Sequence, residues 1–369
     1  MDTVAPSSPS LVLGTGVSTG ASITEATQAG GVVKVTAESG SAVSVIFTNG
    51  TKTVTKTLTG SGVSQAVVLS DKDISTLTDG VISVTTKTID AAGNVSSIGS
   101  TSFTLDTLAP SSPSLVLGNG VSTIASITEA TQASGVVQVT AESGSTVSVI
   151  FTNGTQSVTK TLTGSGGSQA VVLTSNDAST LKDGTISVSA TVKDAAGNIS
   201  ASNTSFVLDI TAPGSPSLIL GTGVSAGASI IEATQASGVV KVTAESGSAV
   251  SVIFTNGTKS VTKTLTGSGV SQAVILTGND LITLTDGVIS VTAKTTDIAG
   301  NVSSVGSTSF TLDTVAPSSP SLVLGTGVST GASITEATQA GGVVKVTAES
   351  GSAVSVIFTM ELSVTKTLT

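Results

Sequence analysis

The chain has 369 residues, of which 38% are hydrophobic and only 10% are charged, and its formal net charge is −9. It has no His, Cys, Trp or Tyr, and all 14 of its basic residues are Lys. These absences exclude Ser-His-Asp and Cys-His catalysis, thiolate zinc sites, disulfides and haem ligation by His or Cys, and they argue against a nucleic-acid partner, which needs a basic surface. We therefore expect no enzymatic activity.

A long internal repeat organises the chain. The motif Asp-x-x-Ala-Pro begins at Asp2, Asp106, Asp209 and Asp313, at spacings of 104, 103 and 104 residues. This period is the size of a domain and disfavours a solenoid, whose repeats are about 20–50 residues long. The repeats expected from the motif are residues 2–105, 106–208, 209–312 and a truncated fourth repeat at 313–369. Both ends are interpreted as cuts from a longer array, and no signal peptide is recognised after Met1.

The first repeat reads as an all-β domain. Alternation of apolar and polar residues predicts strands, and Asn49-Gly50 predicts a hairpin turn. The expected strands are Ser10–Leu13, Gly31–Ala37, Val43–Phe47, Val54–Leu58, Gln65–Leu69, Val81–Ile89 and Thr101–Leu105. Seven strands at this spacing are typical of an immunoglobulin-like β-sandwich. The predicted fold class is therefore a series of tandem sandwiches arranged as an elongated rod, with only the first four strands present in repeat 4.

Two further local predictions concern the link between the fifth and sixth strands and the core. We expect one helical turn at 73–77, capped by Asp73. Phe47 and Phe103 recur in each full repeat and are expected in the core.

The charged residues recur unequally. Acids stand at six matching places in each of the three full repeats; in repeat 1 they are Asp2, Glu25, Glu38, Asp73, Asp79 and Asp90. Among lysines, only Lys56 has counterparts in both other full repeats, at Lys160 and Lys263. The lysine series falls on an expected edge strand, where a lysine discourages edge-to-edge aggregation. Solvation alone would let acids and lysines drift alike, so the recurring acids indicate a role.

Sandwich topology places these acids at two poles. Loops after the second, fourth and sixth strands share the pole where the chain enters, and the other loops share the pole where it leaves. The expected entry-pole set is Asp2, Glu38, Asp90 and Asn94, with Asp106, Glu142, Asp194 and Asn198, then Asp209, Glu245, Asp297 and Asn301, then Asp313 and Glu349. The expected exit-pole set is Glu25 and Asp79, Glu129 and Asp183, and Glu232 and Asp286. Each exit pole should lie next to the entry pole of the following repeat.

A cluster of carboxylates with few lysines nearby is unfavourable unless a cation joins it. Ca²⁺ suits oxygen ligands in irregular loops, so these two sets are the candidate ligands of structural calcium at the repeat junctions. The alternative stays open that the same residues only form turns, where Asp, Asn and Gly are favoured.

The Asp-x-x-Ala-Pro linker and the Asp-Ala-Ala-Gly-Asn loop (90–94 and 194–198) together resemble the bacterial Ig-like repeats of giant biofilm-associated, type I secreted adhesins of Gram-negative bacteria. Repeat 3 departs from the pattern, with Ile298 in place of the first Ala. The resemblance implies an extracellular, cell-surface stalk stiffened by Ca²⁺ at its junctions, with the linker and loop aspartates as ligands.

The expected function is thus a spacer that supports cell adhesion and biofilm formation. Its expected partners are the neighbouring repeats of the same array, with no nucleic acid and no membrane span. A binding domain for surface glycans or a host surface, or one that associates with identical arrays on other cells, is the alternative. The absence of Trp and Tyr weighs against sugar stacking.

Overall fold

The computed structural model describes all residues except 1, 18–19, 225–226, 332–339 and 360–369. The chain divides into two compact units. One unit consists of residues 1–214, 247–249 and 295–303, and the other contains the remaining residues. The first unit contains two hydrophobic cores, one in each of repeats 1 and 2, and the second contains the core of repeat 3. The boundaries expected for the repeats stay a prediction.

Repeat 1 folds into two antiparallel sheets, with the strand orders β1-β2-β5 and β4-β3-β6-β7. The strands are β1 (Ser10–Leu13), β2 (Val33–Thr36), β3 (Ala42–Asn49), β4 (Lys52–Thr59), β5 (Gln65–Val67), β6 (Gly80–Ile89) and β7 (Gly99–Leu105). All seven predicted strands are present, so the predicted all-β sandwich is confirmed. The strands alternate buried and accessible residues because one face of each sheet packs on the core.

Repeats 2 and 3 have the same plan. Repeat 2 contains β8 (Ser114–Leu117), β9 (Ile124–Ala125), β10 (Val137–Thr140), β11 (Thr146–Thr152), β12 (Ser157–Thr163), β13 (Ser168–Val171), β14 (Gly184–Lys193) and β15 (Ile199–Leu208). Repeat 3 contains β16 (Ser217–Leu220), β17 (Val240–Thr243), β18 (Ala249–Thr255), β19 (Ser260–Thr266), β20 (Gln272–Val274), β21 (Gly287–Thr296) and β22 (Gly306–Leu312). The sheet orders are β13-β10-β8 with β12-β11-β14-β15-β9, and β16-β17-β20 with β19-β18-β21-β22.

The core of each full repeat is aliphatic with a central phenylalanine. Phe47, Phe151 and Phe254 are fully buried, and the second phenylalanine of each repeat is 3–5% exposed. The rings of Phe47 and Phe103 meet edge to face, with their centroids 6.5 Å apart. The prediction that these phenylalanines form the core is confirmed.

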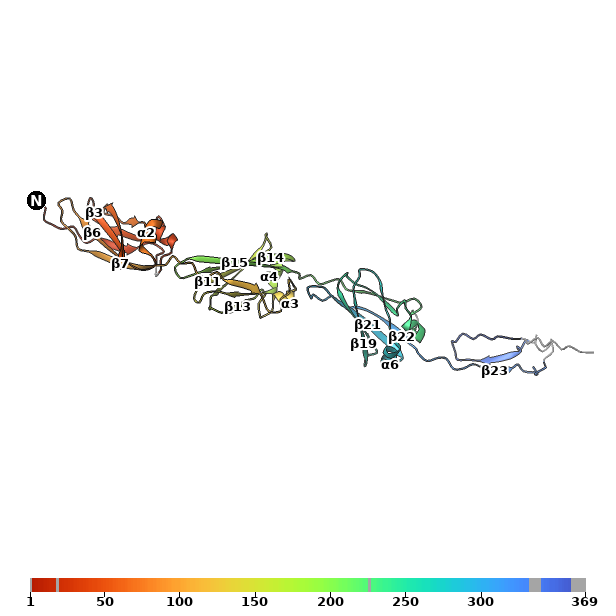
Figure 1. Ribbon diagram of the computed structural model, residues 1–369. Coiled ribbons are helices and arrows are strands. Elements are labelled where there is room, and N and C mark those ends of the chain that lie inside the picture. The colour runs from red at the N-terminus through yellow and green to blue at the C-terminus, as the bar shows by residue number, and fades with distance from the viewer. Residues whose placement is uncertain (1, 18–19, 225–226, 332–339, 360–369) are drawn as a thin grey trace, which may run out of the picture. The chain divides into compact units, whose positions relative to one another are not determined.

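Two short helices accompany each sandwich. They are α1 (Ile23–Thr27) and α2 (Asp71–Leu77), α3 (Ile127–Ala130) and α4 (Ser175–Leu181), and α5 (Ile230–Thr234) and α6 (Gly278–Leu284). Figure 1 shows α3 and α4 side by side at one end of the sandwich of repeat 2. The expected helical turn at 73–77 is present, but its N-cap is Ser70 rather than Asp73, which is the third helical residue. The first helix of each pair was not predicted.

In repeat 4 the described residues form only β23 (Ser321–Leu324) and β24 (Val344–Thr347), which pair with each other. Residues 313–359 are identical to residues 2–48, yet 353–359 form no strand. Phe358 is 67% exposed, whereas its counterpart Phe47 is fully buried. The strands that flank β3 in repeat 1, β4 and β6, have no counterpart among the described residues here, so the expected third strand has no sheet to join. The expected fourth strand, near 363–369, lies outside the described residues.

Candidate functional site: the two poles and the linkers

The loops of the entry pole meet around the start of each repeat. In repeat 1, Asp2, Glu38 and Asp90 line one open pocket of about 430 Å³, together with the turn at 39–41 and Ala91 and Ala92. The loop after the fourth strand joins them, because Gly60 N–H donates to the Ser41 carbonyl at 2.8 Å. The structure therefore brings together the acids that the topology placed at this pole.

The Asp-Ala-Ala-Gly-Asn loop is built around its first carboxylate. Asp90 Oδ1 accepts hydrogen bonds from Ala92 N–H at 2.9 Å and from Asn94 N–H at 2.8 Å, and Oδ2 accepts from Asn94 Nδ2 at 2.8 Å. The Asn94 side chain and these backbone N–H groups stabilise the charged form and lower the pKa of Asp90 below its ordinary value of 3.8. The two asparagine bonds recur in the loops that begin at Asp194 and Asp297, where the N–H of Gly197 and of Gly300 is the other donor to Oδ1, at 2.7 Å in each loop.

The asparagine that ends this loop also binds the linker. Asn94 Nδ2 donates to the Asp2 carbonyl at 3.2 Å, Asn198 Nδ2 to Asp106 at 2.9 Å, and Asn301 Nδ2 to Asp209 at 2.8 Å. Each entry pole thus holds the backbone of its own linker aspartate.

The linker aspartates fold the chain locally. Their Oδ1 atoms accept a hydrogen bond from the N–H two residues later, at 3.0–3.2 Å, in Asp2, Asp106, Asp209 and Asp313. This is the Asx-turn pattern that short polar side chains favour.

The glutamates of the entry pole lie in the turn between the second and third strands. The carbonyls of Glu38 and Glu142 accept from the serine hydroxyl three residues later, at 2.7 and 2.6 Å. Glu245 occupies the same place in repeat 3, and Glu349 accepts from Ser318 N–H at 3.2 Å.

The glutamates expected at the exit pole cap the N-terminus of a helix. Ser22 Oγ accepts from Glu25 N–H at 3.4 Å, and the Glu25 carboxylate accepts from Ser22 N–H at 3.4 Å, which is a capping box on α1. Glu129 and Glu232 do the same for α3 and α5. The Ser-x-x-Glu spacing was visible in the sequence and is the signal that would have predicted these helices.

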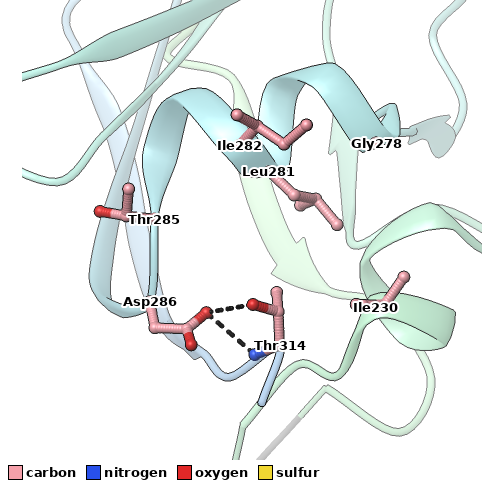
Figure 2. A pocket seen from close by; sticks show the side chains of 7 residues that line it. All are labelled: Ile230, Gly278, Leu281, Ile282, Thr285, Asp286 and Thr314. Atoms are coloured by element: carbon pink, nitrogen blue, oxygen red, sulfur yellow. Dashed lines mark hydrogen bonds between the residues drawn. The ribbon is translucent and has the colours of Figure 1, made fainter. Parts of the chain in front are cut away.

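The aspartates expected at the exit pole bind the linker that leaves the repeat. Asp79 Oδ1 accepts from Thr107 N–H at 2.9 Å and from Thr107 Oγ1 at 2.8 Å. Asp286 holds Thr314 in the same way, at 2.9 and 2.7 Å, as the dashed lines in Figure 2 show. Asp183 Oδ1 accepts from Ile210 N–H at 2.7 Å, and its Oδ2 accepts from the Thr211 hydroxyl.

An apolar groove of about 460 Å³ lies beside this contact in repeat 3. It is lined by Ile230 of α5, by Leu281 and Ile282 of α6, and by Thr285, Asp286 and Thr314 (Figure 2). Ile282 is 75% exposed. The corresponding groove of repeat 1 is lined by Ile23, Ile74, Asp79 and Thr107, among others.

At two linkers, one peptide group is bound from both sides. The peptide group between Asp106 and Thr107 offers its carbonyl to Asn198 and its N–H to Asp79. The peptide group between Asp209 and Ile210 offers its carbonyl to Asn301 and its N–H to Asp183. We call these two groups the junction peptides.

Whether the acids could hold a metal ion depends on their grouping. Within the described residues, no three acidic side chains are close enough together to form a metal-binding group. The entry pole does contain an unused ligand atom, because Asn301 is 7% exposed and its Oδ1 is buried without a hydrogen-bond partner. The acids of both poles thus have turn, cap and linker roles, and their assignment as calcium ligands stays a prediction.

Sequence reasoning missed an ion pair. Lys56 contacts Asp73, Lys160 Nζ lies 2.6 Å from Asp177 Oδ2, and Lys263 Nζ lies 2.6 Å from Asp280 Oδ2. The one recurring lysine and one of the six recurring acids are therefore partners, and the expectation that this lysine protects the edge strand β4 stays a prediction. Their joint recurrence is the signal that could have identified the pair.

Comparison with known proteins gives structural matches only. No protein-family model matches the chain, and no curated protein sequence matches it. Within the described residues, no helix has the length and apolar character of a membrane span.

Among solved structures, the chain is similar to a tetra-tandem repeat in the extending region of a large adhesion protein, with 23% identity over 80% of this chain and 73% of that one and a TM-score of 0.27. It is similar to a Ca²⁺-stabilized adhesin that helps an Antarctic bacterium bind ice, with 24% identity, coverage of 86% and 77%, and a TM-score of 0.37. A third match belongs to a 1.5-MDa bacterial ice-binding adhesin, with 22% identity, coverage of 84% and 98%, and a TM-score of 0.33.

Adhesin repeats, the class of protein that the sequence motifs resemble, are therefore found among the matches.

Proposed function

We propose that the chain is a spacer segment of an extracellular, cell-surface adhesin, in which tandem sandwiches form an elongated rod that carries a binding region away from the cell. The observation that carries this proposal is the junction peptide, because one peptide group of the linker is hydrogen-bonded both to the preceding repeat and to the following one. A linker bound in this way restricts rotation between repeats. Near-identical repeats joined by restricted linkers serve extension and support adhesion and biofilm formation.

Strand length sets the reach of each repeat. The longest strands, such as β6 and β14, have ten residues and span roughly 33 Å at about 3.3 Å per residue. Each added repeat therefore lengthens the array by at least the length of these strands, and it does so by repeating a sequence that the chain already contains.

In the same proposal, Ca²⁺ binds at the entry poles and stiffens the junctions further. The support is chemical: Asp2, Glu38 and Asp90 line one pocket, and repeat 3 leaves the Asn301 amide oxygen without a partner. Carboxylate and amide oxygens are the ligands that Ca²⁺ takes in irregular loops. We limit the calcium proposal to the entry-pole set, because three of its acids line one pocket in repeat 1, whereas the exit-pole glutamate and aspartate of that repeat bind a helix N-terminus and a linker.

The test is small-angle X-ray scattering of the full chain in millimolar Ca²⁺ and in EGTA. We expect the maximum dimension of the particle to decrease and to become less well defined when calcium is removed. An Asp194→Ala variant should show a smaller calcium response, while Asp71→Ala, which removes an exposed acid from α2, should respond like the unmodified chain. A compact particle in both conditions would contradict the spacer function, and an extended particle that ignores EGTA would contradict the calcium part alone.

A further inference from the structure

Each exit pole holds its linker through one aspartate carboxylate. The carboxylates of Asp79, Asp183 and Asp286 each accept one backbone N–H and one threonine hydroxyl from the linker. We refer to this pair of hydrogen bonds as the linker clamp. Both donors belong to the linker itself, so the carboxylate contacts the linker directly.

The clamp persists when the linker sequence changes. In the first and third linkers the threonine follows the aspartate directly, at Thr107 and Thr314, and one carboxylate oxygen accepts both bonds. In the second linker the threonine is displaced by one residue to Thr211, and Ile210 takes its place. Asp183 then uses one oxygen for Ile210 N–H and the other for the Thr211 hydroxyl. The two contacts survive a rearrangement of the donors, as expected of a binding feature rather than of an incidental turn.

The residue before each clamp aspartate has an unusual backbone. Thr78, Lys182 and Thr285 have φ of 59°, 60° and 57° with ψ of 165°, 176° and 166°. This region belongs almost entirely to glycine, and a β-branched residue is a marked outlier there. Because Lys182 adopts the conformation without a hydroxyl, the threonine side chains do not cause it.

The surrounding backbone imposes this conformation. The N–H of Thr78 closes the last turn of α2 by donating to the Ile74 carbonyl at 2.9 Å, and Asn49 Nδ2 binds the Leu77 carbonyl at 2.6 Å. Asn153 and Asn256 bind the ends of α4 and α6 in the same way. Strand β6 begins only two residues after Thr78, at Gly80. The chain must therefore reverse between a fixed helix end and a fixed strand, and the aspartate between them is turned toward the linker.

We propose that the asparagine, the positive-φ residue and the aspartate of each exit pole form a metal-independent clamp, in which the first two position the third on the linker. The inference rests on the proposed spacer function and deepens it, since it gives the linkers a second restraint besides calcium. In Figure 2 the clamp of repeat 3 lies at the edge of the apolar groove, with Thr285 and Asp286 consecutive at the end of α6.

Amide hydrogen exchange of the full chain in EGTA tests the clamp without calcium. We expect the Thr107 amide to exchange at least tenfold more slowly than in an unstructured peptide. Asp79→Ala should remove that protection, and Asp71→Ala, in the same repeat, should not. Asn49→Ala is the test of positioning: it should lower linker protection more than it lowers protection of β6.

Folding of the variants is monitored in the same measurement through the amides of β6 and β7. If Asp79→Ala unfolds repeat 1, Thr107→Val removes the hydroxyl contact from the linker side and should lower linker protection by itself. Linker amides that exchange at the unstructured rate in EGTA would overturn the clamp, as would equal protection in the Asp79→Ala and Asp71→Ala chains. A protected linker in a chain whose scattering ignores calcium would support the clamp while contradicting the calcium part of the proposed function.

Discussion

Asp183 and Asn301 bind opposite sides of the peptide group between Asp209 and Ile210. The carboxylate of Asp183 accepts its N–H at 2.7 Å, and the side-chain amide of Asn301 donates to its carbonyl at 2.8 Å. One residue comes from the loop before β14 and the other from the loop after β21, so two repeats share a single rigid planar group. The two bonds therefore restrain this peptide group from both sides.

The asparagine side of a junction peptide is open to a direct test. Asn198→Ala removes the donor to the Asp106 carbonyl and the donor to Asp194 Oδ2. We expect repeat 2 to lose about 1–2 kcal/mol of stability, since a partly buried carbonyl and a carboxylate each lose a partner. Urea unfolding of the full chain, followed by exchange of the β14 amides, measures the loss.

Asn203→Ala is the matched control in the same repeat. Asn203 is exposed on β15, and an exposed substitution away from special features changes stability by less than about 0.5 kcal/mol. Equal losses in the two variants would show that Asn198 has no particular role at the junction.

Backbone strain at the exit pole predicts a stabilising substitution. Thr285 has φ of 57°, and strain in this region is worth about 1–3 kcal/mol. Thr285→Gly relieves it at an entropic cost of about 0.5–1 kcal/mol, so we expect repeat 3 to gain about 1 kcal/mol in its free energy of unfolding and a higher melting temperature in calorimetry.

The control substitution lies two residues away, and its expected effect on the free energy of unfolding has the opposite sign. Thr283 is inside α6, where glycine disfavours the helix by several tenths of a kcal/mol or more. If Thr283→Gly and Thr285→Gly both destabilise the repeat, the positive φ does not store strain.

A buried hydroxyl in repeat 1 can be tested by giving each of two repeats the residue that the other has at the same position. Thr88 is fully buried on β6, opposite Val43, and its Oγ1 has no hydrogen-bond partner. Repeat 2 has Val192 at the same register position, opposite Val147. Because an unpartnered buried hydroxyl costs about 1–3 kcal/mol, Thr88→Val should stabilise repeat 1 by about 1 kcal/mol in chemical denaturation.

The reverse exchange completes this test. Val192→Thr places a hydroxyl in the aliphatic core of repeat 2 and should destabilise that repeat by a similar amount or more. A neutral result for both substitutions would mean that the Thr88 hydroxyl finds a partner in solution.

Much of this fold could be predicted from the sequence, because apolar and polar residues alternate along a β-strand with a period of two. The same pattern also recurs in each repeat. The seven strands and the phenylalanine core were found in this way. The poles could also be predicted, since strand order fixes which loops are neighbours.

The contacts of individual acids were harder to predict. Glu25 and Asp79 were placed at the exit pole by strand order and proposed as calcium ligands because acids gather there; their hydrogen bonds to a helix N-terminus and to a linker N–H were not predicted. The Ser-x-x-Glu motif could have identified the cap. Nothing in the sequence indicates the positive φ at Thr78 or Lys182, because neither residue type favours it. The surrounding backbone imposes this conformation.

The ion pair of α2 predicts how the stability of repeat 1 depends on pH. Burial raises the pKa of Asp73, but hydrogen bonds from Lys56 and from Ser70 lower it more, so the net pKa lies below the ordinary value of 3.8. Near that pH the unfolded chain binds more protons at this site than the folded chain. The contribution of Asp73 is therefore complete well above pH 3.8 and is lost as the pH falls through its lower, folded pKa.

Asp73→Asn should remove this dependence. Asp73 joins a capping box to a partly exposed ion pair, so the variant should be less stable than the parent by about 1–2 kcal/mol at pH 7. The two chains should converge between pH 3.8 and the folded pKa, where the parent carboxylate also becomes neutral. Denaturant midpoints at pH 7, 4 and 2.5 measure the difference, and Asp71→Asn is the control because Asp71 is exposed in the same helix turn. A difference that stays constant down to pH 2.5 would mean that the charge of Asp73 does not stabilise the fold, and that its contribution comes from the neutral hydrogen bonds of the cap.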